Sequence, residues 1–579
     1  MLRLRTMLGT GLLMSLAACG SDHSDTAATT TTPAATAAAT GVYDSALAFN
    51  KDGYTTINVT IDGVQTPVRW YKEVCYVGKP IEMAGTQSGL RGTTTISNTK
   101  CGYQSMNIFV PESAANDQDT AIYFAVNNAG WMASYVTASV ADGATFNSST
   151  SNVGAALKAG YVYIDVASRS RGITAADGSY PGKAPAAVVD AKAAVRYLRL
   201  NDAAMPGNAN HIVVNGTSGG GALSSILGAS GNSADYYPYL AEIGAAGIDK
   251  DGKSTLHDDV LAINAYCPIT DLGNADLHYE WLFNVLGTRA AVDATSGTYP
   301  GVAGSNTNPT GSASLMNAFV TYQNSLGLKN YDGTALTAST MLANVQDELI
   351  RSAETYMAAG GTIPALGATA TYTSNGPSGS SSFSYTNDWI SVDSASKTVL
   401  SLDIQKYLKF LATQSKLKPT PAFDQTGLTI ATSTVAGGNG GETNLFGTSA
   451  QKYSNFTEYG WNNNDTAGDG VGKDDTGYAW ADYPSRQALL TQTKLINPMA
   501  YIGTDSTTAP YWYIRVGTRD RDTSVTVSMN LSRALKADSK VTDLNYHLAW
   551  DQPHAGNYDV PEAMAWIQQT LAAAKAKGL

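Results

Sequence analysis

The sequence is poor in charged residues. Only 15% of its 579 residues are Asp, Glu, Lys or Arg, and acidic residues outnumber basic ones by 48 to 37. The resulting net charge of −11 excludes the basic surface that a nucleic-acid-binding protein needs. Hydrophobic residues make up 43% of the chain, which excludes an intrinsically disordered protein. We expect a globular protein with a polar, weakly charged surface.

Long hydrophobic runs are also missing. After the first twenty residues no segment reaches the roughly 18 consecutive apolar residues of a transmembrane helix. Residues 1–18 contain two arginines followed by a short apolar stretch, which is typical of a signal peptide, and small residues before Cys19 resemble a bacterial lipobox. Residues 19–41 are a low-complexity Ala/Thr tether. We therefore expect an exported lipoprotein, anchored only through lipid on Cys19 and located at the outer membrane; an ordinary signal peptide is the alternative.

Cysteine is scarce, with four residues in the chain. Cys75 and Cys101 share the N-terminal segment, and an oxidising compartment would allow a disulfide between them. Cys267 lies in an apolar context, which favours a buried small hydrophobic residue over a nucleophile. No CxxC motif or close His/Cys cluster occurs, so we expect neither a metal site nor a cofactor.

The distribution of apolar residues predicts an α/β fold. Residues 57–127 contain β-rich runs, and from residue 152 short buried strands alternate with helical patterns, a rhythm that returns at residues 511–579. Alternating units of this kind favour a mostly parallel central sheet. We therefore predict three segments: a first part of the core at residues 42–269, an inserted lid domain at 270–490 and a second part of the core at 491–579.

The lid is predicted to have little regular strand structure. Helical patterns at 314–325, 338–359 and 402–413 alternate with stretches rich in Gly, Ser and Asn, of which residues 374–388 are an example that we interpret as a loop. A large loop-rich insertion in an α/β core usually covers or shapes a binding site.

The most specific motif is Gly-Thr-Ser-Gly-Gly at residues 216–220. It matches G-x-S-x-G between a predicted buried strand and a helix of small residues, as in a nucleophile elbow. Ser218 is the predicted nucleophile, because the tight turn lifts its hydroxyl above the sheet. The backbone N–H of Gly219 is predicted to bind the oxyanion, and the loop at residues 127–130, represented by Asn128, is predicted to supply the second donor.

A serine nucleophile needs a general base, and the chain contains only six histidines. His554 follows the last predicted strand, which is where an α/β-hydrolase presents its base after the nucleophile and the acid. His547 lies within that strand and is the weaker alternative. We predict His554 as the base.

Two aspartates compete for the role of the triad acid. Asp520 and Asp522 both follow the predicted strand 511–517, and their spacing alone does not separate them. Asp551 is a third candidate, weaker because it is nearly adjacent to the base. The acid would orient the imidazole and stabilise its charged form, whereas Asp522 could instead cap the next helix.

Several longer motifs around these residues resemble those of the bacterial tannase family, the tannin acyl hydrolases. The resemblance extends from about residue 50 to the C-terminus and implies an α/β-hydrolase fold with a large inserted lid. The matching segments are residues 216–233, 266–272, 278–281, 418–424, 442–447, 517–524 and 550–559.

The resemblance also assigns roles to individual residues. It implies that Asp520 is the triad acid, and that Asp522, Lys418 and Glu442 bind the phenolic hydroxyls of a galloyl group. Two departures from the family pattern occur. Gly219 stands where an alanine is expected, and the segment at residues 429–441 is longer than the corresponding segment of the family.

We therefore expect a serine esterase that hydrolyses galloyl esters, and depside bonds as well, through an acyl-enzyme. A feruloyl esterase or general carboxylesterase on the same scaffold is the alternative among enzymes. A lipoprotein that binds tannins or glycans without hydrolysing them is the alternative outside catalysis. The expected partner is a small phenolic ester.

Overall fold

The structure is a computed structural model that describes residues 40–89, 92–136, 140–290, 308–376, 379–413, 417–425, 442–463 and 470–579. Residues 40–579 form one compact unit. The predicted signal peptide, Cys19 and nearly all of the tether lie outside the described residues. No helix within the described ranges is long and apolar enough to cross a membrane.

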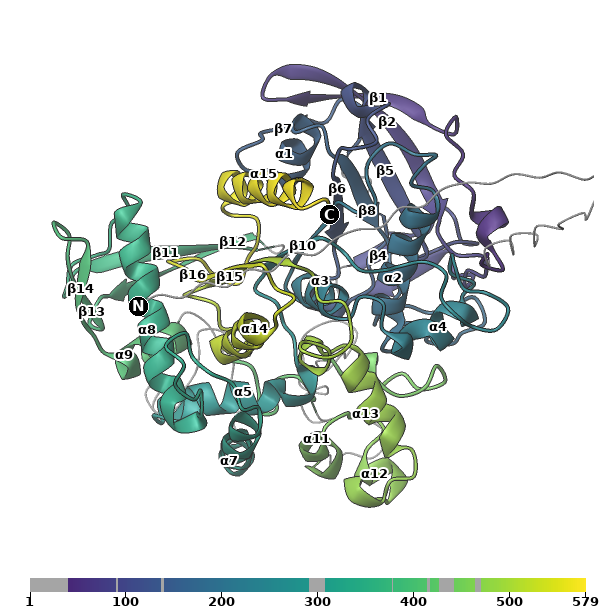
Figure 1. The fold of residues 1–579 in the computed structure, drawn as a ribbon. Coiled ribbons are helices and arrows are strands. Elements are labelled where there is room, and N and C mark those ends of the chain that lie inside the picture. The colour runs from purple at the N-terminus through teal and green to yellow at the C-terminus, as the bar shows by residue number, and fades with distance from the viewer. Residues whose placement is uncertain are drawn as a thin grey trace, which may run out of the picture. The chain divides into compact units, whose positions relative to one another are not determined.

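A ten-stranded sheet forms the centre of this unit (Figure 1). Its six strands from β16 to β8 are parallel, and β5, β2 and β1 continue the sheet antiparallel to one another. The strand order is β16 (Asp543–Ala549), β15 (Tyr511–Gly517), β10 (Ala262–Tyr266), β9 (Ile212–Thr217), β6 (Ile122–Val126), β8 (Val162–Val166), β5 (Ser105–Pro111), β2 (Val64–Cys75), β1 (Thr55–Ile61) and β7 (Thr145–Phe146).

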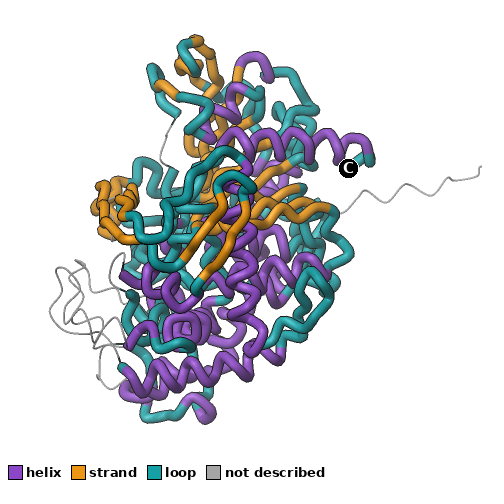
Figure 2. Tube along the Cα trace, turned by 90° about the vertical axis from the view of Figure 1, so that its left-hand side faces the viewer, coloured by secondary structure: helices purple, strands orange, loops and turns teal. Residues whose placement is uncertain are grey.

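Helices cover both faces of the sheet, as the apolar strands require. In β9, Val213 packs into one hydrophobic cluster and Val214 into the other. The first cluster includes residues of α1 (Asn152–Lys158) and α15 (Val560–Ala576). The second includes residues of α2 (Ala186–Leu200), α3 (Gly219–Ala229), α4 (Tyr237–Glu242) and α14 (Val525–Ala537). In Figure 2 the strands run between helices accordingly. The predicted α/β-hydrolase fold with a mostly parallel sheet is thus confirmed.

The chain between β10 and β15 contributes no described strand to the central sheet. Figure 1 shows helices α5, α7, α11, α12 and α13 of this insert on the side opposite α1 and α15. The described α-helices of the whole insert are α5 (Leu272–Asn284), α7 (Pro309–Ser325), α8 (Ala338–Ala358), α9 (Ile404–Thr413), α11 (Glu458–Asn463), α12 (Lys473–Thr476) and α13 (Arg486–Leu495).

The interpretation of residues 374–388 as a loop is wrong. β11 (Thr369–Gly376) pairs antiparallel with β12 (Gly379–Thr386), and a second hairpin follows with β13 (Ile390–Asp393) and β14 (Thr398–Leu402). Tyr372 and Phe383 are direct partners across the first hairpin, and both rings contact Phe410 of α9. Aromatic residues alternating with small polar ones give this hairpin one apolar face, which outweighs its loop-like composition.

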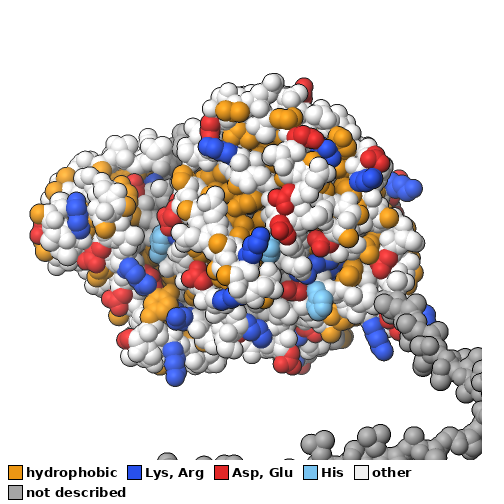
Figure 3. Space-filling model, turned by 45° about the horizontal axis from the view of Figure 1, so that its top comes forward, with side chains coloured by type: hydrophobic (Ala, Val, Ile, Leu, Met, Phe, Trp, Pro, Cys, Tyr) orange, Lys and Arg blue, Asp and Glu red, His pale blue; other side chains and the backbone are white. Residues whose placement is uncertain are grey.

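A disulfide joins Cys75 at the end of β2 to Cys101, with 5.8 Å between their Cα atoms. The two cysteines are 26 positions apart, and the segment between them contains a small hairpin of β3 (Thr86–Gly89) and β4 (Gly92–Thr95). Charged side chains on the face shown in Figure 3 are scattered among uncharged ones, in keeping with the low charge content.

Candidate active site

The turn from β9 to α3 holds Ser218 in a strained backbone conformation, with φ 63° and ψ −124°. A non-glycine residue rarely adopts a positive φ, and such strain is found mainly at functional positions. A Cβ atom on Gly216 would collide with the backbone of Gly220 and lie 2.6 Å from Ser224 Oγ. The first glycine of the motif is therefore required by the close approach of α3.

Three of the predicted residues form one hydrogen-bonded chain. His554 Nε2 lies 2.9 Å from Ser218 Oγ, and His554 Nδ1 lies 2.8 Å from Asp520 Oδ2. Asp520 follows β15 and His554 follows β16, and these neighbouring parallel strands end in register at Gly517 and Ala549. Parallel strands thus deliver the acid and the base to the same edge of the sheet as Ser218.

The other candidates for the acid and the base have different partners or surroundings. The Asp551 carboxylate lies 2.6 Å from Arg519 Nε. His547 lies in β16, where burial and then the charge of Arg515 lower its pKa to about 4. Asp522 does not cap α14, because Ser524 accepts the capping hydrogen bond. Its backbone N–H instead donates to Asp520 Oδ1 at 2.9 Å.

Electrostatics favour a charged imidazolium next to the acid. Burial of His554 opposes its charged form, but the charge of Asp520 and the hydrogen bond to it outweigh burial and raise the pKa of His554 well above its usual range. Such an arrangement stabilises the proton that the base would receive from a serine.

Cys267 contacts this chain, a feature that no sequence motif indicated. Ligand atoms of Cys267, Asp520 and His554 all lie within 4.8 Å of one another. Burial, followed by the charge of Asp520, raises the pKa of the Cys267 thiol, and its Sγ lies 3.3 Å from the carbonyl oxygen of Ala555. Both ring nitrogens of His554 already have protein partners, so we interpret the cluster as side-chain contact and not as a metal site.

The loop after β6 lies against the start of α3. A Cβ atom on Gly219 would collide with the backbone of Asn128 and of Trp131 in the short helix η3 (Ala129–Trp131). This contact gives a physical reason for glycine where the family has alanine. The Asn128 side chain donates to the Met132 carbonyl at 2.9 Å and accepts from Ser168 at 3.0 Å. These two bonds turn the Asn128 side chain toward Met132 and Ser168, so we assign the second oxyanion donor to the backbone N–H groups of this loop.

Of the three residues assigned to ring hydroxyls, Asp522 and Lys418 are close enough for the charge of one to act on the other. Burial alone would raise the pKa of Asp522, but the positive charges of His554, Lys418 and Arg521 outweigh it and lower that pKa. Lys418 Nζ lies 4.2 Å from the centre of the Phe423 ring. A carboxylate and an ammonium group are thus available beside the His554 chain.

Glu442 has a partner that the sequence did not reveal. Its Oε1 lies 3.3 Å from Arg171 Nη2, and Arg171 Nε donates to the carbonyl of Gly130 at 2.7 Å. Arg171 therefore links the lid residue Glu442 to η3, the loop beside the predicted nucleophile.

Helix α5 holds the segment that carries Lys418. The Lys418 backbone N–H donates to Tyr279 Oη at 3.0 Å, and Arg289 donates to the Lys418 carbonyl at 3.1 Å. Further along, Asp276 accepts the backbone N–H groups of Phe423 and Asp424 at 2.7 and 3.1 Å. The position of Lys418 is consequently determined by contacts between two segments far apart in the sequence.

The chain is similar to known proteins over much of its length. A family model described as BD-FAE matches residues 106–281. Among solved structures, the chain is similar to a tannase of Fusobacterium nucleatum, with 31% identity, a TM-score of 0.67, and coverage of 91% of this chain and 99% of the other. A Lactobacillus plantarum tannase is 28% identical, with a TM-score of 0.65 and coverage of 91% and 100%.

A tannin acyl hydrolase in complex with ethyl gallate is also 28% identical, with a TM-score of 0.65 and coverage of 90% and 98%. Curated protein sequences give no match. The identity to the Fusobacterium enzyme extends over nearly the full length of both chains. On this evidence the chain belongs to the bacterial tannase family, whose members hydrolyse esters on an α/β-hydrolase fold.

Proposed function

We propose that this protein is a serine esterase that releases gallate from galloyl esters, including depside bonds. The observation that carries the proposal is the chain Ser218–His554–Asp520, with hydrogen-bond distances of 2.9 and 2.8 Å at a strained strand-to-helix turn. A nucleophile, a base bonded to it and an acid that orients the base are the parts needed for acyl transfer.

In the proposed reaction Ser218 Oγ attacks the ester carbonyl while His554 Nε2 takes the serine proton. The carbonyl oxygen becomes an oxyanion bound by the Gly219 N–H and a backbone N–H of the loop before η3. Collapse of this intermediate breaks the C–O bond, and His554 returns its proton to the departing alcohol. Water, deprotonated by His554, then attacks the acyl-enzyme and releases gallate with Ser218 restored.

Galloyl specificity would come from Asp522, Lys418 and Glu442. Gallate carries three adjacent ring hydroxyls, which can donate to carboxylates and accept from an ammonium group. An ester without these hydroxyls would offer no hydrogen-bond partner to Asp522 and Lys418, which opposes its binding, whereas Glu442 would keep its ion pair with Arg171. The ethyl gallate complex of a 28% identical relative supports this choice of substrate.

The first test measures gallate release from methyl gallate by residues 40–579, beside methyl ferulate, for the wild type and Ser218→Ala. We expect gallate release that is lost in the variant and little hydrolysis of the ferulate. Equal or faster ferulate hydrolysis would favour the feruloyl esterase alternative. Absence of turnover of both esters, with no labelling of Ser218 by a fluorophosphonate, would favour the binding-protein alternative.

The second test replaces the ring-binding groups singly, as Asp522→Asn, Lys418→Met and Glu442→Gln. Loss of a charged hydrogen bond costs about 1.5–3 kcal/mol, so kcat/KM for methyl gallate should fall by roughly 10- to 100-fold. Methyl benzoate hydrolysis should fall much less. Lys409→Met on the exposed side of α9 is the matched control. Equal losses for both esters would contradict a role in hydroxyl recognition.

We also propose export and acylation at Cys19, on the sequence evidence alone. Labelled palmitate should be incorporated into the full chain and not into Cys19→Ser. Incorporation into both would exclude Cys19 as the lipid attachment site.

A further inference from the structure

The guanidinium group of Arg171 contacts two parts of the proposed active site. Its Nε donates to the Gly130 carbonyl of η3 at 2.7 Å, and its Nη2 lies 3.3 Å from Glu442 Oε1 in the lid. The ion pair is buried, with the side chains of Arg171 and Glu442 only 9% and 8% exposed. Because the guanidinium is planar and rigid, these contacts hold η3 and the Glu442 carboxylate in one arrangement.

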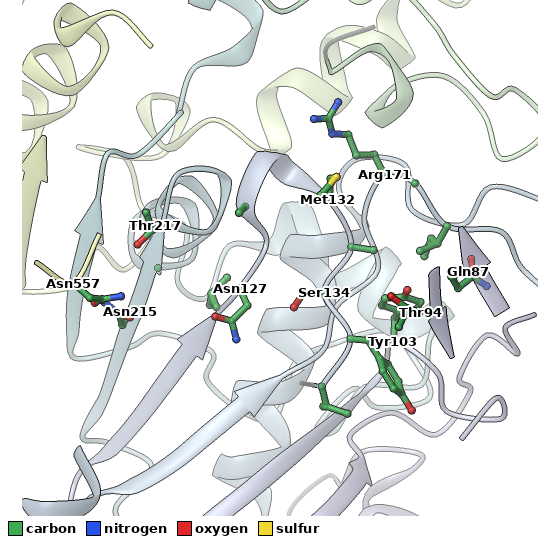
Figure 4. Close-up of a pocket in the computed structure, with 18 of the residues that line it drawn as sticks. Gln87, Thr94, Tyr103, Asn127, Met132, Ser134, Arg171, Asn215, Thr217 and Asn557 are labelled. Carbon is green, nitrogen blue, oxygen red and sulfur yellow. The ribbon is translucent and has the colours of Figure 1, made fainter. Parts of the chain in front are cut away.

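Arg171 also lines one end of a cavity of about 710 Å³ at the carboxyl ends of β6 and β9 (Figure 4). Its backbone forms a β-bridge with Met132, which follows η3. In Figure 4 its guanidinium group points away from Asn127 and Tyr103 in the rest of the lining. The charged end of Arg171 is therefore directed at η3 and Glu442 and not at the centre of the cavity.

The backbone of η3 adopts a conformation that needs support. Gly130 and Trp131 have φ values of 64° and 54°, and a positive φ is unfavourable for tryptophan. The carbonyl groups of both residues accept hydrogen bonds from the neighbouring segment. Ser170 Oγ donates to the Trp131 carbonyl at 2.5 Å, beside the bond from Arg171 Nε to Gly130. Arg171 thus helps to hold η3 in this conformation.

The position of η3 bears on the reaction because η3 packs against Gly219. A Cβ atom on Gly219 would collide with the Trp131 nitrogen and the Asn128 oxygen. The N–H of Gly219 and a backbone N–H of this loop are the two donors assigned to the oxyanion. Because a displacement of about 1 Å can lower a rate by roughly 100-fold, a loosened η3 would slow the reaction of every ester.

On the lid side, Arg171 sets the direction of a ring-binding group. Glu442 directly precedes the short helix η5 (Thr443–Leu445), and its N–H donates to the Phe423 carbonyl at 3.0 Å. A carboxylate is planar, so the contact at Oε1 also determines where Oε2 can accept from a ring hydroxyl. Without Arg171, the Glu442 carboxylate would lose the cation that offsets its burial.

We infer that Arg171 is a positioning residue that serves both substrate recognition and catalysis. It directs Glu442 toward the ring hydroxyls, and it holds η3 for stabilisation of the oxyanion. The inference rests on the proposed galloyl esterase function and adds to it a residue that acts through its two neighbours.

The test measures kcat and KM separately for methyl gallate and for p-nitrophenyl acetate, using the full chain. The acyl group of p-nitrophenyl acetate has no ring hydroxyls, so its kcat reports on η3. The ratio of kcat/KM for methyl gallate to kcat/KM for p-nitrophenyl acetate reports on Glu442. Urea unfolding of each variant shows whether it is folded.

The variants separate the two contacts. Arg171→Met removes both, whereas Arg171→Lys keeps a positive charge for Glu442 but has no donor in the place of Nε. Arg171→Met is also combined with Glu442→Gln. Arg533→Met is the matched control, because Arg533 forms a buried ion pair with Glu348 at 2.6 Å, between α14 and α8.

We expect Arg171→Met to lower kcat for p-nitrophenyl acetate by about fivefold or more at nearly constant KM. It should also lower the ratio by about tenfold or more, and Glu442→Gln in addition should lower the ratio no further, because both changes disable one group. Arg171→Lys should keep the ratio within about threefold of the wild type and still lose kcat for p-nitrophenyl acetate. Arg533→Met should change neither quantity.

A ratio that stays at the wild-type value in Arg171→Met, or that falls further in the double variant, would overturn the role in ring recognition. An unchanged kcat for p-nitrophenyl acetate would overturn the role at η3, and Arg171→Lys decides this point if Arg171→Met does not fold. Equal losses in Arg533→Met would overturn both roles. Absence of gallate release by the wild type, with p-nitrophenyl acetate still hydrolysed, would overturn the galloyl function and not the role at η3.

Discussion

At the scale of single residues, the site contains backbone conformations that are unfavourable in isolation. Ser218 has φ 63° and Cys267 has φ 44°, and neither is glycine. Each costs of order 1–3 kcal/mol and persists only where the surroundings determine it. The Ser218 N–H donates to the Tyr266 carbonyl at 2.9 Å, and the Cys267 N–H donates to the Arg515 carbonyl at 2.7 Å. Adjacent parallel strands thus hold the strained residues beside His554.

The charge of Asp520 should set the pH dependence of the esterase. A general base must be neutral, which requires a pH above its pKa, and Asp520 raises the pKa of His554. The acid limb of kcat/KM should therefore lie above pH 6.5 in the wild type and move to lower pH in Asp520→Asn. The same variant should lose about 10⁴-fold in kcat, because the imidazole is no longer held in the correct tautomer.

Profiles of methyl gallate hydrolysis across the acid limb check this expectation. Asp551→Asn is the control, because its carboxylate pairs with Arg519 and not with His554. An acid limb that stays in place when Asp520 is neutralised would contradict the assignment of Asp520.

At the scale of secondary-structure elements, α5 holds later segments of the lid through buried carboxylates. Asp276 on α5 accepts the backbone N–H groups of Phe423 and Asp424. Asp424 in turn accepts from Asn455 at 2.7 Å and from Thr457 Oγ1 at 2.6 Å. Three segments of the chain converge on these two carboxyl groups, and Lys418 is carried by one of them.

Burial, followed by the charge of Asp424, raises the pKa of Asp276 to about 8. An unfolded aspartate titrates near 3.9. Because the folded pKa is the higher one, this group favours folding at low pH, and its contribution is lost progressively between about pH 4 and pH 8. The slope is at most about 1.4 kcal/mol per pH unit.

Asp276→Asn removes this titration, so the stability of the variant relative to the wild type should rise between pH 5 and pH 8. Urea unfolding at both pH values measures it, with Asp388→Asn on the lid as a control. A constant difference between variant and wild type would show that Asp276 does not titrate in this range.

The hydrogen-bonded chain Ser218–His554–Asp520 could be predicted because each member lies next to a recognisable strand. Spacing alone did not separate Asp520 from Asp522, and only the family resemblance chose between them. Ser218 is bracketed by glycines, and Asp520 and His554 directly follow strands that are neighbours in the sheet. The link between Arg171 and Glu442 spans 271 positions and has no local signal. The hairpin at 369–386 was missed because its apolar face comes from aromatic residues spaced among serines and threonines, and composition alone conceals that alternation.

At the scale of the whole molecule, the disulfide and the cavity belong to one part of the core. Between Cys75 and Cys101 the chain leaves the central sheet to form the β3–β4 hairpin, and Gln87 and Thr94 of that hairpin line the cavity. Gln87 is tied to the Thr174 backbone by two hydrogen bonds of 2.9 Å. The disulfide therefore closes the loop that brings this wall to the carboxyl end of the sheet.

Replacing both cysteines, as Cys75→Ser with Cys101→Ser, should lower the free energy of unfolding by about 3 kcal/mol, because the unfolded chain regains the freedom of a 26-residue loop. Urea unfolding of the variant and of the oxidised and reduced wild type measures the change. The reduced wild type should match the variant, since Cys267 has no disulfide partner in either. Oxidised and reduced protein of equal stability would mean that the hydrogen bonds of Gln87 already hold the hairpin, and that the disulfide adds nothing to them.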